Sequence, residues 1–159
     1  IQMNMESQPT LMDRSLWCLY SAVARTASGA GAEVILLGQL ADELFGGYAK
    51  YERILASLGE RQAAECMDRD IEGYMTKGMV RDRSACSAWL EPRFPFVGEA
   101  VIEFGRSIPM SFKIRNGVRK AVLREAATIL GLPVDIAGAA KKAAQYSSGI
   151  QKVIRSSRF

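Results

Sequence analysis

Apolar residues recur at helical spacing along most of this chain. From Thr10 to about Ala27 they repeat every three or four residues, which predicts a helix with one apolar face. Further helices are predicted from about Asp42 to Leu58, Glu60 to about Lys77, Val80 to Leu90, Glu99 to Arg106, Val118 to Leu130 and Ser147 to about Arg155. The pair Gly46-Gly47 should interrupt the second helix, because a glycine inside a helix costs about 1 kcal/mol relative to alanine.

One segment reads as a strand instead of a helix. The apolar run Val34–Leu37 predicts a buried strand over Glu33–Leu37. Glu91–Phe96 should be extended, because its two prolines disfavour helical backbone in the residues before them. A strand this apolar needs neighbours on both sides, and one strand cannot form a stable parallel sheet. The chain itself is therefore predicted to be mostly α-helical with one clear strand.

The segment after that strand carries candidate chemistry. It places Asp42 and Glu43 side by side, followed by Gly46, Gly47 and Tyr48. Open α/β sheets bind ligands just beyond the carboxyl ends of their strands, and adjacent carboxylates suit Mg²⁺, which often brings phosphates with it. The alternative is that Asp42 caps a helix and Glu43 lies in its first turn. The pattern by itself favours the helix start.

Composition narrows the chemistry that such a site can use. The 159 residues suit one domain and include no histidine, which excludes His-based triads and His-liganded zinc. The three cysteines are odd in number and lack a Cys-x-x-Cys pair, so a reducing, cytoplasmic location is expected. No apolar run is long enough to span a membrane, and no signal peptide is visible. The net charge of +4 is too modest to indicate nucleic-acid binding.

Several segments, taken in order, carry a family resemblance. They are Asp42-Glu-Leu-Phe-Gly-Gly-Tyr48, Asp82–Phe96, Ile108-Pro109, Lys120-x-x-Leu123-Arg124, Gly131–Pro133, Lys141-Lys142 and Gln145–Gly149. Over about residues 10 to 155 this order resembles the synthetase domain of glutamine-hydrolysing asparagine synthetases. The relatives of that domain include the β-lactam synthetases, the carbapenam synthetases and the lasso-peptide cyclases.

The resemblance implies a fold and a reaction. The fold would be α/β, like that of the adenine nucleotide α-hydrolases, with a parallel sheet covered by helices. The reaction would be an ATP- and Mg²⁺-dependent amide synthesis, in which a small-molecule carboxylate becomes an acyl-adenylate with release of pyrophosphate. A nitrogen nucleophile from a glutaminase domain or another ammonia source then displaces AMP. Membrane association is not expected, and a homo-oligomer is left open.

The resemblance also implies roles for particular residues. Asp42 would bind metal and pyrophosphate; Glu43, Gly46, Gly47 and Ser147 would adjoin the nucleotide. Tyr48, Glu91 and Arg93 would border the acceptor substrate, with Glu91 also counted as catalytic. Lys141 or Lys142 would stabilise the adenylate, with Lys142 preferred. The alternatives are a purely structural glycine turn, a buried ion pair between Arg93 and a carboxylate such as Asp82, and an exposed basic pair at the start of a helix.

The sequence departs from the family pattern in three places. Gln39 replaces a glutamate and cannot act as a general base near neutral pH. Leu40 replaces a glycine, so the loop should be less permissive of positive φ. The family's Ser-Gly-Gly-x-Asp-Ser nucleotide loop is absent, so residues 1–159 are expected to be the C-terminal part of the domain, completed by an N-terminal half in the same or a separate chain. The alternative is a catalytically degenerate binding or assembly domain.

Overall fold

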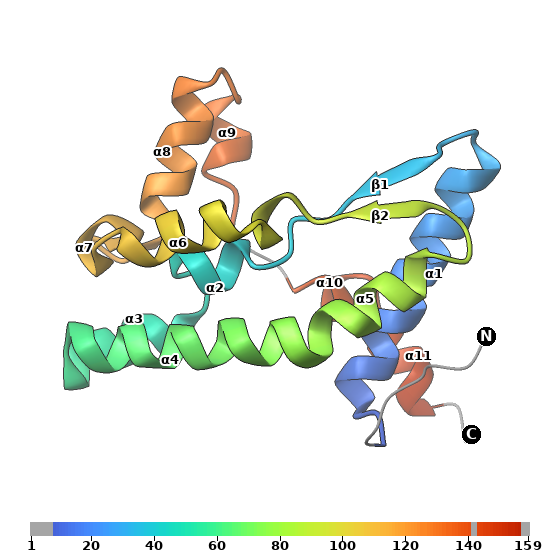
Figure 1. Cartoon of the computed structure of the whole chain (residues 1–159), viewed down its shortest axis with the longest axis horizontal. Helices are drawn as coiled ribbons and strands as arrows, with labels where there is room; N and C mark the ends of the chain where they lie inside the picture. The colour runs from blue at the N-terminus through green and yellow to red at the C-terminus, as the bar shows by residue number, and fades with distance from the viewer. Residues whose placement is uncertain (1–7, 141–142, 157–159) are drawn as a thin grey trace. The chain divides into compact units, whose positions relative to one another are not determined.

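The computed structural model describes residues 8–140 and 143–156, and Figure 1 shows the course of the chain. The described residues are mostly helical, with one small parallel and one small antiparallel sheet. The chain forms two compact units. The first comprises Ile1–Leu37, Met75–Arg93 and Lys141–Phe159; the second comprises Gly38–Tyr74 and Phe94–Ala140.

The first unit is built on helix α1, Leu11–Gly29. Its start is fixed by a capping box, in which Thr10 accepts from the Asp13 amide and Asp13 accepts from the Thr10 amide. Helix α1 packs against α5 (Met79–Cys86), α10 (Ala144–Ser147) and α11 (Ile150–Ser156). The sequence predicted α5 as a helix over Val80–Leu90, but the helix ends earlier, at Cys86, and a turn follows.

Two strands of the first unit lie side by side (Figure 1). Strand β1 (Val34–Leu36) pairs in parallel with β2 (Glu91–Arg93), so the prediction of one strand was wrong. Pro92 fits into β2 because the bonds to β1 use its neighbours: the Glu91 amide donates to Glu33, and the Leu37 amide donates to the Arg93 carbonyl. Leu36 remains 69% exposed, which is unusual because parallel strands are normally covered on both faces.

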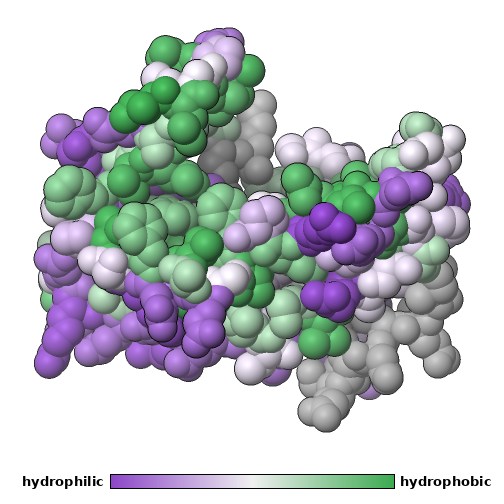
Figure 2. All heavy atoms as spheres, turned by 45° about the horizontal axis from the view of Figure 1, so that its top comes forward, coloured by the Kyte–Doolittle hydropathy of each residue, from purple (hydrophilic) through white to green (hydrophobic). Residues whose placement is uncertain are grey.

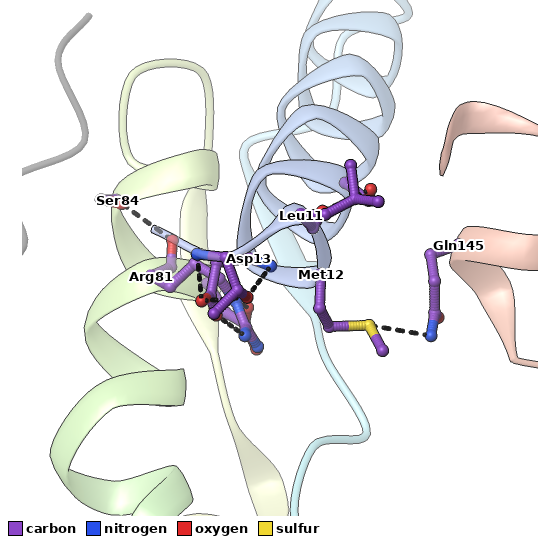
Figure 3. A network of polar contacts seen from close by, with 9 residues as sticks. Leu11, Met12, Asp13, Arg81, Ser84 and Gln145 are labelled. Carbon is purple, nitrogen blue, oxygen red and sulfur yellow. Dashed lines mark hydrogen bonds and ion pairs between the residues drawn. The ribbon is translucent and has the colours of Figure 1, made fainter. Parts of the chain in front are cut away.

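A network of polar contacts joins the elements of the first unit (Figure 3). Arg81 on α5 contacts Asp13 at 2.9 Å and the fully buried Asp82 at 2.7 Å. The Gln145 amide on α10 contacts the Met12 sulfur at 3.1 Å. Arg81 and Asp82 both lie on α5, and Arg81 also contacts Asp13 on α1, so the Arg81–Asp82 ion pair helps to pack α5 on α1. Arg93 pairs with Glu91 instead.

The second unit begins with short helices around a turn. Helix α2 (Ala41–Phe45) stops at Gly46, and α3 (Ala49–Leu58) starts after Tyr48, which confirms the predicted interruption at Gly46-Gly47. Helix α4 (Glu60–Gly73) follows, and the chain then passes to the first unit through the π-helical turn η1, Tyr74–Gly78. The core of this unit is a cluster of buried side chains: Tyr51, Ala63, Met67, Met110 and Ile114.

The rest of the second unit contains a hairpin that the sequence prediction missed. It comprises a 3₁₀ turn η2 (Pro95–Val97), helices α6 (Glu99–Ser107) and α7 (Met110–Lys113), strands β3 (Ile114–Arg115) and β4 (Val118–Arg119), and helices α8 (Ala121–Ile129) and α9 (Val134–Ala137). Val118 thus lies in a strand, not in a helix. Asn116 and Gly117 have φ of 52° and 75°, the two positive values that a tight hairpin turn requires.

Apolar side chains gather on the surface of α8 and α9 and the segment between them, as Figure 2 shows in green. The most exposed are Ile129 at 81% and Leu130 at 87%. Among the described residues, no helix is both long enough and apolar enough to cross a membrane. All three cysteines are free thiols, and burial raises the pKa of Cys86 to about 11, so this thiol is unreactive at neutral pH.

Candidate functional site

The turn that joins α2 to α3 holds the candidate residues of the second unit. The N-cap of α2 is Leu40, which makes no side-chain capping bond, so the prediction that Asp42 might be a helix cap was wrong. Glu43 does lie in the first helical turn, as that alternative expected. Leu40 has φ of 71°, although leucine was expected to make the loop less permissive of positive φ. The chain therefore keeps a left-handed residue where the family pattern has glycine.

Asp42 forms an ion pair that the sequence prediction did not include. Its Oδ1 lies 2.9 Å from Nζ of Lys120, and each side chain is 22% exposed. Both side chains are therefore partly exposed, although the paired oxygen of Asp42, Oδ1, is itself buried. A partly exposed carboxylate beside an ammonium is an arrangement that suits a ligand combining a metal ion with phosphate, because each component finds an opposite charge.

Gly47 makes this arrangement sterically feasible. A β-carbon at this position would lie 1.8 Å from Asp42 Oδ1 and 2.8 Å from Lys120 Cε, far inside van der Waals contact. The Gly47 amide also donates to the Asp42 carbonyl at 2.7 Å, which closes the end of α2. Gly46 has a different role, because it ends α2 at φ of 73° and packs against Ile114. The two glycines therefore serve both the turn and the ion pair beside it.

Lys120 reaches Asp42 through the local geometry of the β3–β4 hairpin. It follows β4 directly and serves as the N-cap of α8, with φ of 56°, a conformation that costs a non-glycine residue roughly 1–2 kcal/mol. Its neighbour Arg119 donates to the Gly47 carbonyl at 3.4 Å. Arg124 on α8 donates to the carbonyls of Ala137 and Ala139 and so joins α8 to the end of α9.

Glu43 and Tyr48 face each other within the same turn. The Tyr48 hydroxyl donates to Glu43 Oε1 at 2.7 Å, which holds the first residues of α2 against the start of α3. The pKa of the Glu43 carboxyl is raised, mainly because the group is buried. The hydrogen bond from Tyr48 lowers this pKa in part, and the negative charge of Asp42 raises it further. Burial and the Glu43 charge likewise raise the pKa of Tyr48. The hydrogen bond between Tyr48 and Glu43 therefore fixes both side chains within the turn.

The remaining predicted residues lie in the first unit or outside the described residues. Glu91 and Arg93, two positions apart on β2, form an exposed ion pair at 2.9 Å, so the alternative of a buried pair between Arg93 and a carboxylate such as Asp82 was wrong. Ser147 ends α10, and its hydroxyl donates to the Ala144 carbonyl at 3.4 Å. Lys141 and Lys142 lie outside the residues that the structure describes. The structure thus brings Asp42, Glu43, Gly46, Gly47 and Tyr48 into one turn, and Glu91 and Arg93 onto one strand.

The residues at the turn fit a magnesium ion that is bound mainly through phosphate. Within the described part of the chain, no group of three or more carboxylate or cysteine side chains is arranged to hold a metal ion. Mg²⁺ usually keeps several waters and takes only one or two carboxylates together with substrate phosphates. The partly exposed Asp42 carboxylate, with the Lys120 ammonium 2.9 Å from its Oδ1, matches that requirement and does not match an all-protein metal cage.

The comparisons with known proteins assign the family of this chain. The family model described as asparagine synthase matches residues 3–65 and 55–156, so the chain belongs to the asparagine synthase family. It is 35% identical over 161 residues to a protein of Methanocaldococcus jannaschii whose name describes a putative glutamine-hydrolyzing asparagine synthetase, covering 80% of this chain and 30% of that protein.

Animal relatives give the same assignment. The chain is 35% identical over 133 residues to asparagine synthetase domain-containing protein 1 of Mus musculus, covering 80% of this chain and 21% of the mouse protein. It is 33% identical over 153 residues to an asparagine synthetase domain-containing protein of Drosophila melanogaster, covering 89% of this chain and 27% of that protein. The chain therefore spans less than a third of the length of each of these relatives.

Lys120 and Arg119 are the site residues that sequence reasoning missed. The Lys-x-x-Leu-Arg segment indicated kinship, but nothing local to Lys120 indicated a partner on α2. The available signal was Asn116-Gly117, because this dipeptide predicts a tight hairpin that returns the chain toward its start.

Proposed function

We propose that this chain is part of an ATP- and Mg²⁺-dependent, amide-forming ligase that activates a small-molecule carboxylate as an acyl-adenylate and releases pyrophosphate. The observation that carries the proposal is the 2.9 Å pair between Asp42 and Lys120, held in a turn that follows an apolar parallel strand. Membership of the asparagine synthase family supports the class of reaction.

The residues of the turn divide the work of binding pyrophosphate. Asp42 would hold the metal ion. When bound, this ion would neutralise the negative charge that develops on the phosphates. Lys120 would exchange part of its contact with Asp42 for a phosphate oxygen, because a compact ammonium suits a point charge on phosphate. Gly47 keeps the space between them open, and Glu43 with Tyr48 holds the backbone of the turn.

The remaining roles rest on the resemblance and on exposure. Glu91 and Arg93 would border the acceptor carboxylate, and their exposed positions leave both side chains reachable by a ligand. Lys142, or else Lys141, would stabilise the adenylate, and Ser147 would adjoin the nucleotide. We further propose that an N-terminal half of the synthetase domain, in the same or a separate chain, supplies the nucleotide loop, and that a glutaminase domain or ammonia source supplies nitrogen.

The test measures pyrophosphate release from ATP with a panel of small carboxylates, using this chain joined to or mixed with the N-terminal half. Asp42→Asn and Lys120→Met should each reduce release by about a hundredfold, the usual effect of removing one group that stabilises transition-state charge. Lys152→Met, a change on the exposed face of α11, is the matched control and should leave release unchanged. Undiminished release in both variants would refute the assigned roles.

A second function is favoured by Gln39, which is neutral where the family pattern has glutamate. The chain would then bind Mg-ATP as an assembly domain without completing amide synthesis. Isothermal titration separates the two functions, because the assembly domain would bind Mg-ATP with no pyrophosphate release. A Gln39→Glu variant that restored release would assign the loss to this one residue.

A further inference from the structure

Lys113, the last residue of α7, is a buried lysine in the second unit. Its exposed fraction is 5%, whereas lysines are almost never buried unless they are paired. It lines a cavity of about 40 Å³ whose apolar walls include Leu44, Met67 and Ile71. Asp68 and Arg106 contribute the polar part of the lining.

The two acids whose charges act on Lys113, Asp68 and Glu60, are engaged with other groups. Asp68 pairs with Arg106 Nε at 2.8 Å, and the Glu60 carboxylate accepts from the Met110 amide at 2.8 Å. Within the part of the chain that the structure describes, no carboxylate lies within 4.0 Å of the Lys113 ammonium. Burial lowers the pKa of Lys113, and the charges of Asp68 and Glu60 oppose this without reversing it. A larger share of this amine is therefore neutral than in an exposed lysine.

The cavity beside the buried Lys113 is small and its walls are largely apolar, so it favours small, uncharged molecules. The cavity of about 40 Å³ is roughly three times the 10–15 Å³ that one water molecule requires, so a linear triatomic molecule fits. Carbon dioxide has this size, carries no charge and is attacked at carbon by free amines. We propose that Lys113 is a modification site that takes up carbon dioxide reversibly as a carbamate.

The step balances without any further reactant. The lone pair of Lys113 Nζ forms the new N–C bond, and one C=O electron pair moves onto oxygen. One N–H proton leaves through the cavity mouth to water, so a neutral amine and CO₂ give a carbamate anion and a proton. Arg106 also lines the cavity; its side chain is 45% exposed, and its guanidinium has N–H groups beyond the Nε that Asp68 uses. These donors can bind the carbamate oxygens.

The same geometry predicts how neighbouring residues tune the modification. Arg106→Gln removes the positive charge beside the carbamate and should lower its occupancy several-fold. Asp68→Asn removes a like charge and should raise the occupancy. Opposite signs from the two members of one exposed ion pair distinguish an electrostatic effect on the carbamate from a general loosening of the fold.

The experiment equilibrates the full chain with carbon-13-labelled bicarbonate at mildly alkaline pH and records carbon-13 spectra. One carbamate resonance should appear in the parent chain and in Lys152→Met, and disappear in Lys113→Met. Methylation with a trimethyloxonium salt, followed by peptide mass spectrometry, should locate the methyl carbamate on Lys113. Circular dichroism checks that the variants fold. The absence of the resonance from the folded parent chain, or its persistence in Lys113→Met, overturns the proposal; equal occupancy in Arg106→Gln and Asp68→Asn overturns the assigned role of the cavity charges.

Discussion

Replacing Gly47 by alanine tests the geometry of the candidate site with one methyl group. The added β-carbon would lie 1.8 Å from Asp42 Oδ1 and 2.7 Å from Asp42 Cγ, so the carboxylate must move. It would also lie 2.8 Å from Lys120 Cε, so the ammonium must move with it. Unlike Gly46, Gly47 does not need a positive φ, and the effect of the substitution is therefore steric.

The expected cost follows from the groups that must be displaced. Forcing an extra methyl into a well-packed site typically costs roughly 1–3 kcal/mol through shifted side chains and backbone. The loss of the Asp42–Lys120 pair adds about 0.2–1 kcal/mol, because both side chains are 22% exposed and solvent screens their attraction. Gly47→Ala should therefore destabilise the second unit by about 1–4 kcal/mol.

Urea denaturation followed by circular dichroism at the helical minimum measures this cost. Gly38→Ala is the matched control, since Gly38 lies in the loop just before α2, has no positive φ and has no heavy atom within 4 Å of an added β-carbon. That change should alter the unfolding free energy by less than about 0.5 kcal/mol. Repeating Gly47→Ala in an Asp42→Ala background removes the main clash and should recover most of the loss. An equal cost in both backgrounds would refute the steric reasoning.

Three further predictions concern buried charge and turn geometry. The pKa of Glu43 is raised in the folded chain, so its contribution to stability is present below the unfolded pKa of 4.5 and is lost as the pH rises through the folded pKa. Glu43→Gln can still accept the Tyr48 hydrogen bond, and it should remove this fall in the unfolding free energy, measured by urea denaturation above pH 4.5. The pKa of Lys113 is lowered by folding, so below pH 10.5 the unfolded chain binds more protons than the folded chain, and the unfolding free energy rises with pH in this range. Lys113→Met should reduce that rise, measured by urea denaturation at several pH values in CO₂-free buffer. Gly117→Ala places a side chain at φ of 75° and should lower the unfolding free energy by roughly 1–2 kcal/mol in urea, whereas Gly73→Ala on α4 should raise it slightly.

The sequence predicted those elements whose cause is local. Helix α1 follows from its apolar spacing and from the capping residues Thr10 and Asp13, and the break at Gly46-Gly47 follows from the cost of helical glycine. The β3–β4 hairpin was missed because the apolar spacing of Val118 with later residues resembles one helical face, and this outweighed the Asn-Gly turn signal. Strand β2 was predicted only as extended backbone, because its pairing depends on β1, far away in the chain.

The candidate site was predictable in part for the same reason. Asp42, Glu43, Gly46, Gly47 and Tyr48 are neighbours in sequence, so their placement in one turn could be expected. Lys120 joins them through a tertiary contact, and no periodicity within its own segment indicates a carboxylate partner on α2. The Glu91–Arg93 pair was predicted as two substrate-facing residues, but their alternation on one strand also lets them bond each other directly.

Leu40 adopts a left-handed backbone conformation although it is not a glycine. Its φ of 71° costs a leucine roughly 1–2 kcal/mol, which a glycine would avoid. Its side chain is only 1% exposed, and burial of a leucine contributes about 1.5–3 kcal/mol. The packing gain is therefore similar to or larger than the strain, and the loop adopts the left-handed conformation that glycine would adopt freely. Since Leu40 is apolar, the difference in charge from the family pattern in this loop rests on Gln39, where a neutral amide stands in place of a carboxylate.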